Sequence, residues 1–231
     1  MKSLAACILA LIIAGPSSGE DFLPLETGYF WTYVADDGVQ EMRLVGEQVP
    51  VFTGSPYEIE YPISANNQGL VNYWTSEADG DVLLWGFFRN GWGYLYQPPI
   101  RMLDAPLSVG KTWTTTVDLY SLPDTVFVET AEITLMVHES LDLTVPAGVF
   151  PAFGIGSPDP GTKTLIKGGF TLWGESMTDK VLTTDAWYSE GVGEVQYNTE
   201  RLYRLETYTD HPVAVQVSSW GAVKALYHGK R

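Results

Sequence analysis

Pro24-Leu25-Glu26-Thr27-Gly28-Tyr29-Phe30-Trp31-Thr32 is a phrase that the chain uses twice. The second copy, Pro106-Leu107-Ser108-Val109-Gly110-Lys111-Thr112-Trp113-Thr114, keeps Pro, Leu, Gly, Trp and Thr at the same positions. Five identities at fixed spacing are hard to credit to chance. Pro-Leu enters in an extended conformation, Gly permits a tight bend, and Trp and Thr continue with residues that favour strands. We therefore interpret the phrase as the entrance to a β-strand.

The two copies resemble each other only over the phrase itself, because the similarity fades beyond Thr32 and Thr114. Two interpretations are open: two degenerate half-domains, or two strand entrances in one sheet. We favour the second, because no Gly/Ser-rich or Pro-rich linker divides the chain. The distance between the copies is also too long for one blade or coil of a repeat protein.

Short alternations of apolar and polar residues recur along the chain, and helical periodicity is weak. Residues 81–88 are apolar at nearly every position, which is typical of a strand covered on both faces. One face of the strand at 126–137 is expected to carry Phe127, Ala131, Ile133, Leu135 and Val137. The pattern predicts an all-β fold, a single antiparallel β domain that forms a sandwich or an open half-barrel with little helix.

Turn signals separate these segments. Asp36-Asp37-Gly38 and Asp79-Gly80-Asp81 predict hairpin turns, because Asp and Gly tolerate the positive φ that such turns require. Val145-Pro146-Ala147-Gly148 suits a type I turn. Two close prolines in Ser157-Pro158-Asp159-Pro160-Gly161 predict an exposed loop.

The N-terminus is typical of an export signal. Leu4 to Ala14 is an unbroken apolar run after Lys2, too short to span a bilayer. We therefore expect a signal peptide at 1–19, an antiparallel β domain at 20–217 and a short basic tail at 218–231. The tail either docks on its own domain or serves as a recognition or sorting segment.

The cysteine count and the charge exclude several classes. Cys7, the only cysteine, lies within the signal and ahead of most of its apolar run, so the mature chain has no thiol chemistry or disulfide. The formal net charge of −15 repels phosphate backbones and anionic membrane surfaces. We expect no nucleic-acid partner and no membrane span.

Several phrases, taken in order, resemble those of a family of secreted bacterial β domains of uncharacterised function. They are Pro-Leu-x-x-Gly-x-x-Trp-x-Tyr at 24–33, Pro-Ala-Gly-x-Phe at 146–150, Trp-Tyr-x-x-Gly-Val-Gly-x-Val at 187–195 and Leu-Glu-Thr-Tyr at 205–208. The resemblance covers residues 22 to about 208 and implies a secreted or cell-envelope β domain. It carries over no catalytic residue. The chain departs from the family in lacking a properly placed lipoprotein cysteine.

No catalytic or metal motif is assembled in the sequence. Gly15-Pro16-Ser17-Ser18-Gly19 matches a nucleophile elbow but lies in the signal and follows no strand. His138, beside Glu139, forms no metal-binding pair with another histidine, and a structural role is favoured. Acidic turns at 36–37 and 77–81 are candidates for Ca²⁺. We predict no catalytic residue, no metal ligand and no cofactor.

The aromatic residues around Arg89-Asn90-Gly91 are the best candidates for a ligand-binding site. The candidate ligand-binding residues are Trp85, Phe87, Trp92, Tyr94 and Tyr96. If exposed, these rings form a platform for a sugar or an apolar ligand. If buried, they form a core hairpin, which is the more frequent role of such clusters.

These features favour an exported, non-enzymatic binding or scaffolding protein of the bacterial envelope or surface, either secreted or periplasmic. Its partner would be a carbohydrate, an apolar ligand or another envelope protein. One alternative is a secreted carbohydrate-active hydrolase with paired carboxylates. Another is a calcium-stabilised structural module.

Overall fold

Every regular element of the described residues is a β-strand. The computed structural model describes residues 21–46, 61–65, 70–89, 91–158, 165–166, 170–171, 174–175, 186–198 and 201–209. The barrel strands are β1 (Phe30–Ala35), β2 (Gln40–Val45), β3 (Tyr61–Ala65), β4 (Leu70–Ser76), β5 (Val82–Arg89), β6 (Trp92–Leu103), β7 (Thr112–Leu122), β8 (Val126–Val145), β9 (Gly148–Gly156), β13 (Ala186–Ser189), β14 (Gly193–Asn198) and β15 (Leu202–Tyr208). A separate three-stranded sheet comprises β10 (Leu165–Ile166), β11 (Phe170–Thr171) and β12 (Gly174–Glu175).

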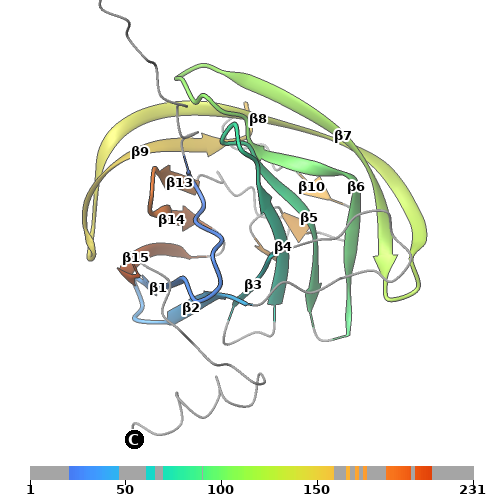
Figure 1. Cartoon of the computed structure of the whole chain (residues 1–231), viewed down its shortest axis with the longest axis horizontal. Helices are drawn as coiled ribbons and strands as arrows, with labels where there is room; N and C mark the ends of the chain where they lie inside the picture. The colour runs from blue at the N-terminus through green and yellow to red at the C-terminus, as the bar shows by residue number, and fades with distance from the viewer. Residues whose placement is uncertain are drawn as a thin grey trace, which may run out of the picture.

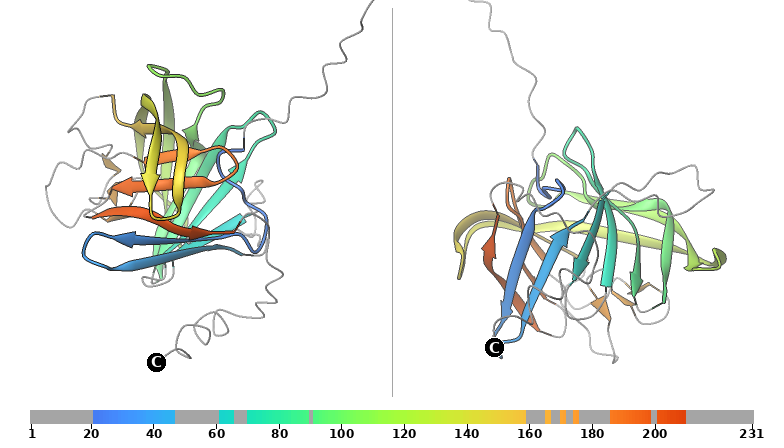
Figure 2. Two further views of the ribbon diagram at one scale, coloured as in Figure 1. Left: turned by 90° about the vertical axis from the view of Figure 1, so that its left-hand side faces the viewer. Right: turned by 60° about the horizontal axis from the view of Figure 1, so that its bottom comes forward.

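The barrel follows the chain order. Each strand from β1 to β9 pairs antiparallel with the next, β9 pairs with β13, and the order continues through β14 and β15. β15 then pairs with β1, so the described strands form a closed ring with β7 and β8 arching along one side (Figure 1). Figure 2 shows the ring from two further sides. The predicted all-β antiparallel fold is confirmed, and the β1–β15 ladder joins the edges that an open half-barrel would leave.

Both copies of the repeated phrase form the same turn before their strands. Gly28 and Gly110 have φ values of 99° and 86°, in the region that favours glycine. The Gly28 N–H donates to the carbonyl oxygen of Val45 at 3.0 Å, and the Gly110 N–H donates to that of Val137 at 2.8 Å. Each turn is thereby fixed to the strand next to the one it enters. The interpretation of the phrase as a strand entrance is confirmed.

The predicted hairpin turns also occur at the expected positions. The segment around Asp36-Asp37-Gly38 joins β1 to β2, the segment at 77–81 joins β4 to β5, and Pro146-Ala147 joins β8 to β9. The predicted loop at 157–161 falls largely outside the described residues, as do the predicted signal peptide at 1–19 and the basic tail at 218–231. The described residues include no helix that is long and apolar enough to cross a membrane.

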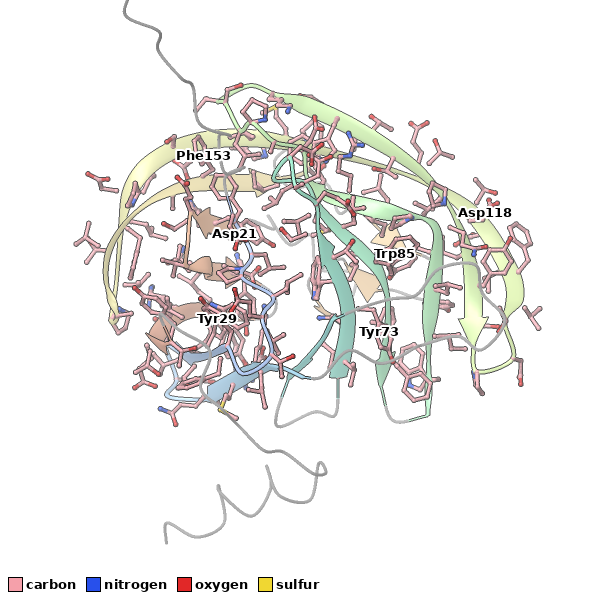
Figure 3. All side chains as sticks on the ribbon, viewed as in Figure 1. Asp21, Tyr29, Tyr73, Trp85, Asp118 and Phe153 are labelled. Carbon is pink, nitrogen blue, oxygen red and sulfur yellow. The ribbon has the colours of Figure 1, made fainter. Side chains whose placement is uncertain are left out.

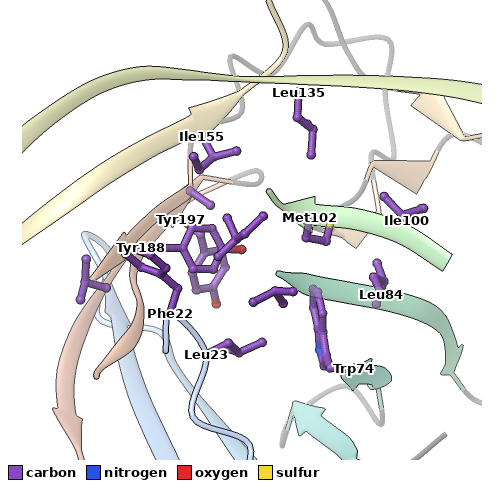
Figure 4. Close-up of a cluster of buried hydrophobic side chains, with 14 of the residues drawn as sticks. Phe22, Leu23, Trp74, Leu84, Ile100, Met102, Leu135, Ile155, Tyr188 and Tyr197 are labelled. Carbon is purple, nitrogen blue, oxygen red and sulfur yellow. The ribbon is translucent and has the colours of Figure 1, made fainter. Parts of the chain in front are cut away.

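The core lies inside the barrel, where strands from all sides contribute large side chains. Figure 4 shows Tyr188 and Tyr197 on one side of this interior, with Met102 and Trp74 opposite them. The largest fully buried side chains are Trp31, Tyr33, Tyr96, Tyr197, Phe22, Ile100, Met102, Leu103, Leu119, Ile133 and Leu135. Full burial of one such apolar side chain stabilises the fold by about 1.5–3 kcal/mol, so this interior is the main source of stability.

One predicted strand face is wrong at a single residue. Ile133, Leu135 and Val137 are buried as expected, but Phe127 is 53% exposed. A register shift in the β7–β8 ladder pairs Phe127 with Tyr120, and their rings meet edge to face at 5.8 Å. One extra residue in a strand moves the side chains beyond it to the other face.

Candidate functional site

The β5–β6 hairpin brings three of the five predicted site residues together. Phe87 pairs with Tyr94 across the ladder, and Trp92 begins β6. The ring centroid of Phe87 lies 5.6 Å from that of Trp92 and 5.8 Å from that of Tyr94, and the centroids of Trp92 and Tyr94 are 6.3 Å apart. All three contacts are edge to face, which is the favourable arrangement for aromatic quadrupoles. We call Phe87, Trp92 and Tyr94 the aromatic triad.

The aromatic triad packs against the main core of the barrel but is not wholly enclosed. Phe87 is 8% exposed, whereas Trp92 and Tyr94 are half-buried at the margin of the core. Tyr96, the fourth predicted residue, is buried within the same core. Burial raises the pKa of the Tyr96 phenol, so this side chain stays neutral.

Trp85, the fifth predicted residue, is not part of the triad. It packs in a second cluster, around Leu95 and Leu122, that also includes Tyr73, which Figure 3 labels with Trp85. The indole N–H of Trp85 donates to the hydroxyl of Thr75 at 3.0 Å. A register shift next to Trp85 in the β5–β6 ladder explains why Leu84 and Phe87 both reach the main core while Trp85 does not.

A second candidate site is a buried group of charges that the sequence did not predict. Arg43 on β2 donates through Nε to Glu41 Oε1 at 2.8 Å and through Nη1 to Glu194 Oε2. Its guanidinium carbon lies 4.1 Å from the ring centroid of Tyr197 and 4.9 Å from that of Tyr33. The arginine is therefore held by two carboxylates and two aromatic faces. We call Glu41, Arg43, Glu194, Tyr33 and Tyr197 the arginine cluster.

Hydrogen bonds fix most of the arginine cluster. The hydroxyl of Tyr33 donates to the carbonyl oxygen of Glu194 at 2.8 Å, and the hydroxyl of Tyr188 donates to Glu194 Oε1 at 3.3 Å. The ring of Tyr197 stacks on that of Tyr203 with centroids 4.9 Å apart. The hydroxyl of Tyr197 is the exception: among the described side chains it is the buried polar atom without a hydrogen-bond partner.

Burial and charge act in opposite directions on this cluster. Burial raises the pKa of Glu194, although the charge and hydrogen bond of Arg43 lower it. Burial would lower the pKa of Arg43, but Glu194 and Glu41 raise it above its ordinary value. Arg43 thus stays protonated, and burial raises the pKa values of the Tyr33 and Tyr197 phenols.

Sequence reasoning missed the arginine cluster because its partners are far apart in the chain. Arg43 and Glu194 are separated by 151 positions. The sequence around Glu194 gives no clear signal, because residues 193–197 are all buried in the structure but do not form an apolar run in the sequence. A carboxylate buried in this way needs a buried partner, although the sequence cannot name it.

Three of the five acidic residues considered for Ca²⁺ pair with arginine. Asp36 pairs with Arg204, and Asp37 pairs with Arg201 at 2.8 Å. Asp81 pairs with Arg101 at 3.1 Å and accepts a hydrogen bond from the backbone N–H of Ala105. Within the part of the chain that the structure describes, no three His, Cys, Asp or Glu side chains gather as metal ligands.

His138 makes contacts of a structural kind. Its Nε2 lies 2.8 Å from the carbonyl oxygen of Ser157 and donates to it, since a carbonyl can only accept. The neighbouring Glu139 accepts a hydrogen bond from the indole N–H of Trp187 at 3.2 Å. The first contact joins β8 to the segment that follows β9, and the second joins β8 to β13, which lies on the other side of β9.

Comparison with known proteins does not identify a family for this chain. No family model matches the chain, and no curated protein matches it. A solved structure similar to it is a crystal structure described as a "putative lipoprotein" from Parabacteroides distasonis ATCC 8503, with 15% identity and a TM-score of 0.31. The match covers 83% of this chain and 99% of the other. An identity of 15% and a TM-score of 0.31 are too low to indicate a shared fold or a shared function.

Proposed function

We propose that the protein is an exported, non-enzymatic binding protein of the bacterial envelope or surface, and that it holds a carbohydrate or apolar ligand on the aromatic triad. The observation that carries this proposal is the edge-to-face contact of Phe87, Trp92 and Tyr94 on one hairpin, with Trp92 and Tyr94 half-buried at the core margin. Trp92 and Tyr94 each combine a flat apolar ring with one polar group, an indole N–H or a phenol hydroxyl, which suits both ligand classes.

Export is supported by the sequence of residues 1–19, with its apolar run and small residues before Glu20. Of the other predicted site residues, Tyr96 is too deeply buried to touch a ligand, and Trp85 belongs to the second cluster. The proposed ligand site therefore comprises the aromatic triad, which is three of the five site residues predicted from the sequence.

The test is a binding screen with glycan arrays and with fatty acids of graded length. Trp92→Ala should weaken any hit at least tenfold, because a stacking aromatic surface is lost. Trp85→Ala is the matched control: it also removes an indole from the same hairpin, but from the second cluster, and should leave binding unchanged. Equal loss in both variants, or no hit in either screen, would contradict the proposal.

The arginine cluster supports a second function. Glu41 and Glu194 both bind the guanidinium of Arg43, and burial raises the pKa of Glu194. A carbohydrate hydrolase needs two carboxyl groups near each other, one of them with a raised pKa. Hydrolysis of a panel of nitrophenyl glycosides by the wild type, lost in Glu194→Gln, would favour this alternative. Its absence across the panel would leave the binding function.

A further inference from the structure

The hydroxyl of Tyr197 lacks a partner where partners are expected. The residue is 1% exposed, and its hydroxyl makes no hydrogen bond within the described residues. Buried hydroxyl groups almost always have a partner, because burying one without compensation costs free energy. An atom of this kind calls for an explanation such as an absent ligand or an ordered water molecule.

Arg43, beside it, also has donors left over. A guanidinium carries five N–H groups. The hydrogen bonds of Arg43 to Glu41 and Glu194 use Nε and Nη1, and its contacts with Tyr33 and Tyr197 are made through the ring faces. The Nη2 donors are not used by any of these contacts. These donors and the unpaired hydroxyl belong to neighbouring side chains, because the guanidinium carbon lies 4.1 Å from the centroid of the Tyr197 ring.

The cluster has an accessible side and a closed side. The side chains of Arg43 and Glu41, both on β2, keep 17% and 11% of their surface exposed. Glu194 on β14 keeps 4%, and Tyr197 lies on the same strand. A ligand would therefore enter past β2 and reach Tyr197 last.

Charge limits the class of ligand. Two carboxylates share one guanidinium, so the cluster is already negative by one unit when both are ionised. An anion would be repelled by this net negative charge. A cation would be repelled by the N–H groups of Nη2, which carry part of the positive charge of the guanidinium. A neutral molecule with hydroxyl groups fits: its oxygens accept from Nη2, and a hydroxyl hydrogen is donated to Tyr197.

We propose that Arg43 and Tyr197 form a binding site, separate from the aromatic triad, for a neutral hydroxyl-bearing small molecule of the sugar or polyol class. The site is assembled from β2 and β14, with Tyr33 and Glu194 as supports that hold the guanidinium in place.

The experiment measures binding and thermal stability of Tyr197→Phe in the mature chain. The probes are glucose, galactose and N-acetylglucosamine in one arm, and glycerol and myo-inositol in the other, followed by calorimetry and ligand-observed NMR. Tyr197→Phe should weaken binding at least tenfold, because a site built for a hydroxyl loses its partner. It should leave the melting temperature equal or higher, because an unpaired buried hydroxyl is removed.

Tyr33→Phe is the matched control for stability. It removes a tyrosine hydroxyl that already donates to the Glu194 carbonyl, so its melting temperature should fall. A Tyr197→Phe protein that melts lower, with no probe bound by the wild type, indicates a buried water only and overturns the inference. Probe binding that Trp92→Ala abolishes and Tyr197→Phe does not would place the ligand on the triad. That result overturns this inference and leaves the proposed function standing.

Discussion

Trp31 and Trp113 make the same hydrogen bond from the two copies of the repeated phrase. The indole N–H of Trp31 donates to the carbonyl oxygen of Val192 at 2.6 Å, and that of Trp113 donates to the carbonyl oxygen of Arg101 at 2.8 Å. The first bond joins positions 161 residues apart, whereas the second joins positions 12 apart. One sequence device therefore serves two purposes: Trp113 fixes neighbouring strands, and Trp31 ties the start of the barrel to its end.

Replacing Trp31 should cost more than replacing Trp113. Trp31→Phe leaves the buried carbonyl of Val192 without its donor, which costs about 1–3 kcal/mol. Trp113→Phe loses the same kind of bond, but Trp113 is 8% exposed against 1% for Trp31, so water can replace part of it. Urea unfolding of the two variants, compared with the wild type, measures the difference. Equal losses would show that the Trp31–Val192 bond has no special weight in closing the barrel.

Gly110 should be required for its backbone conformation rather than for space. Its φ is 86°, and a Cβ built there meets no heavy atom within 4 Å. Gly110→Ala should therefore destabilise the fold by about 1–2 kcal/mol through the backbone alone. Gly110→Asn should cost less, because asparagine tolerates positive φ better than alanine. The free energies of unfolding of the two variants test this prediction. A larger loss of stability in Gly110→Asn than in Gly110→Ala would contradict a requirement for positive φ.

The parts of the fold that the sequence predicted are those with a local cause. Positive φ at Gly28 and Gly110, the Asp-Gly hairpins and the strand entrances each follow from a few adjacent residues. The sequence predicted less accurately which side chains share one face of a strand. At Phe127 and at Trp85 a register shift changes which cluster the side chain joins. Gly86 lies at the second shift, and a glycine inside a strand is typical of such an irregularity, whereas no glycine lies in the strand around Phe127.

The two candidate sites also differ in whether their residues are close together in the sequence. The aromatic triad was predictable because its rings lie within one hairpin, so sequence proximity ensures spatial proximity. The arginine cluster was not predictable, because Arg43 and Glu194 meet only when β1 and β15 pair and bring the first and last strands together. Closing a barrel creates such contacts without leaving a motif.

Asp104 should stabilise the fold at neutral pH and lose this effect in acid. Its carboxylate binds Arg101 Nη1 at 2.8 Å and Lys111 Nζ at 2.9 Å. Burial alone would raise its pKa, but these two partners lower it below the ordinary value of 3.8. A folded-state pKa below the unfolded value gives stability that is present above the unfolded pKa and lost as the pH falls through the folded pKa.

Asp104→Asn should therefore lower the free energy of unfolding at about pH 7 by up to about 1 kcal/mol, since the group is partly exposed. The difference from the wild type should shrink as the pH falls below about 4. Urea titrations at several pH values measure it, with Asp118→Asn as the control on β7: Asp118 accepts from Thr130 and makes no ion pair among the described residues. A constant difference at every pH would argue against the ionic origin.

Arg43 should be needed to neutralise Glu194, and the effect should depend on pH. Arg43→Met keeps much of the apolar stem but leaves a carboxylate with 4% of its side chain exposed and without the positive charge that Nη1 supplies. Removing one partner of a buried ion pair costs about 3–5 kcal/mol. Burial already raises the pKa of Glu194, and loss of Arg43, which lowers it, raises it further.

A folded-state pKa above the unfolded value gives stability that is complete below the unfolded pKa and lost as the pH rises through the folded pKa. Arg43→Met should therefore be least destabilised near about pH 4 and most destabilised near about pH 8. The double variant Arg43→Met/Glu194→Gln should recover part of the loss at the higher pH and show a flatter profile, because the buried charge is gone. Thermal or urea unfolding across this range measures both proteins. If the single variant lost the same free energy at every pH, Arg43 would be acting through its packing against Tyr33 and Tyr197 and not through its charge.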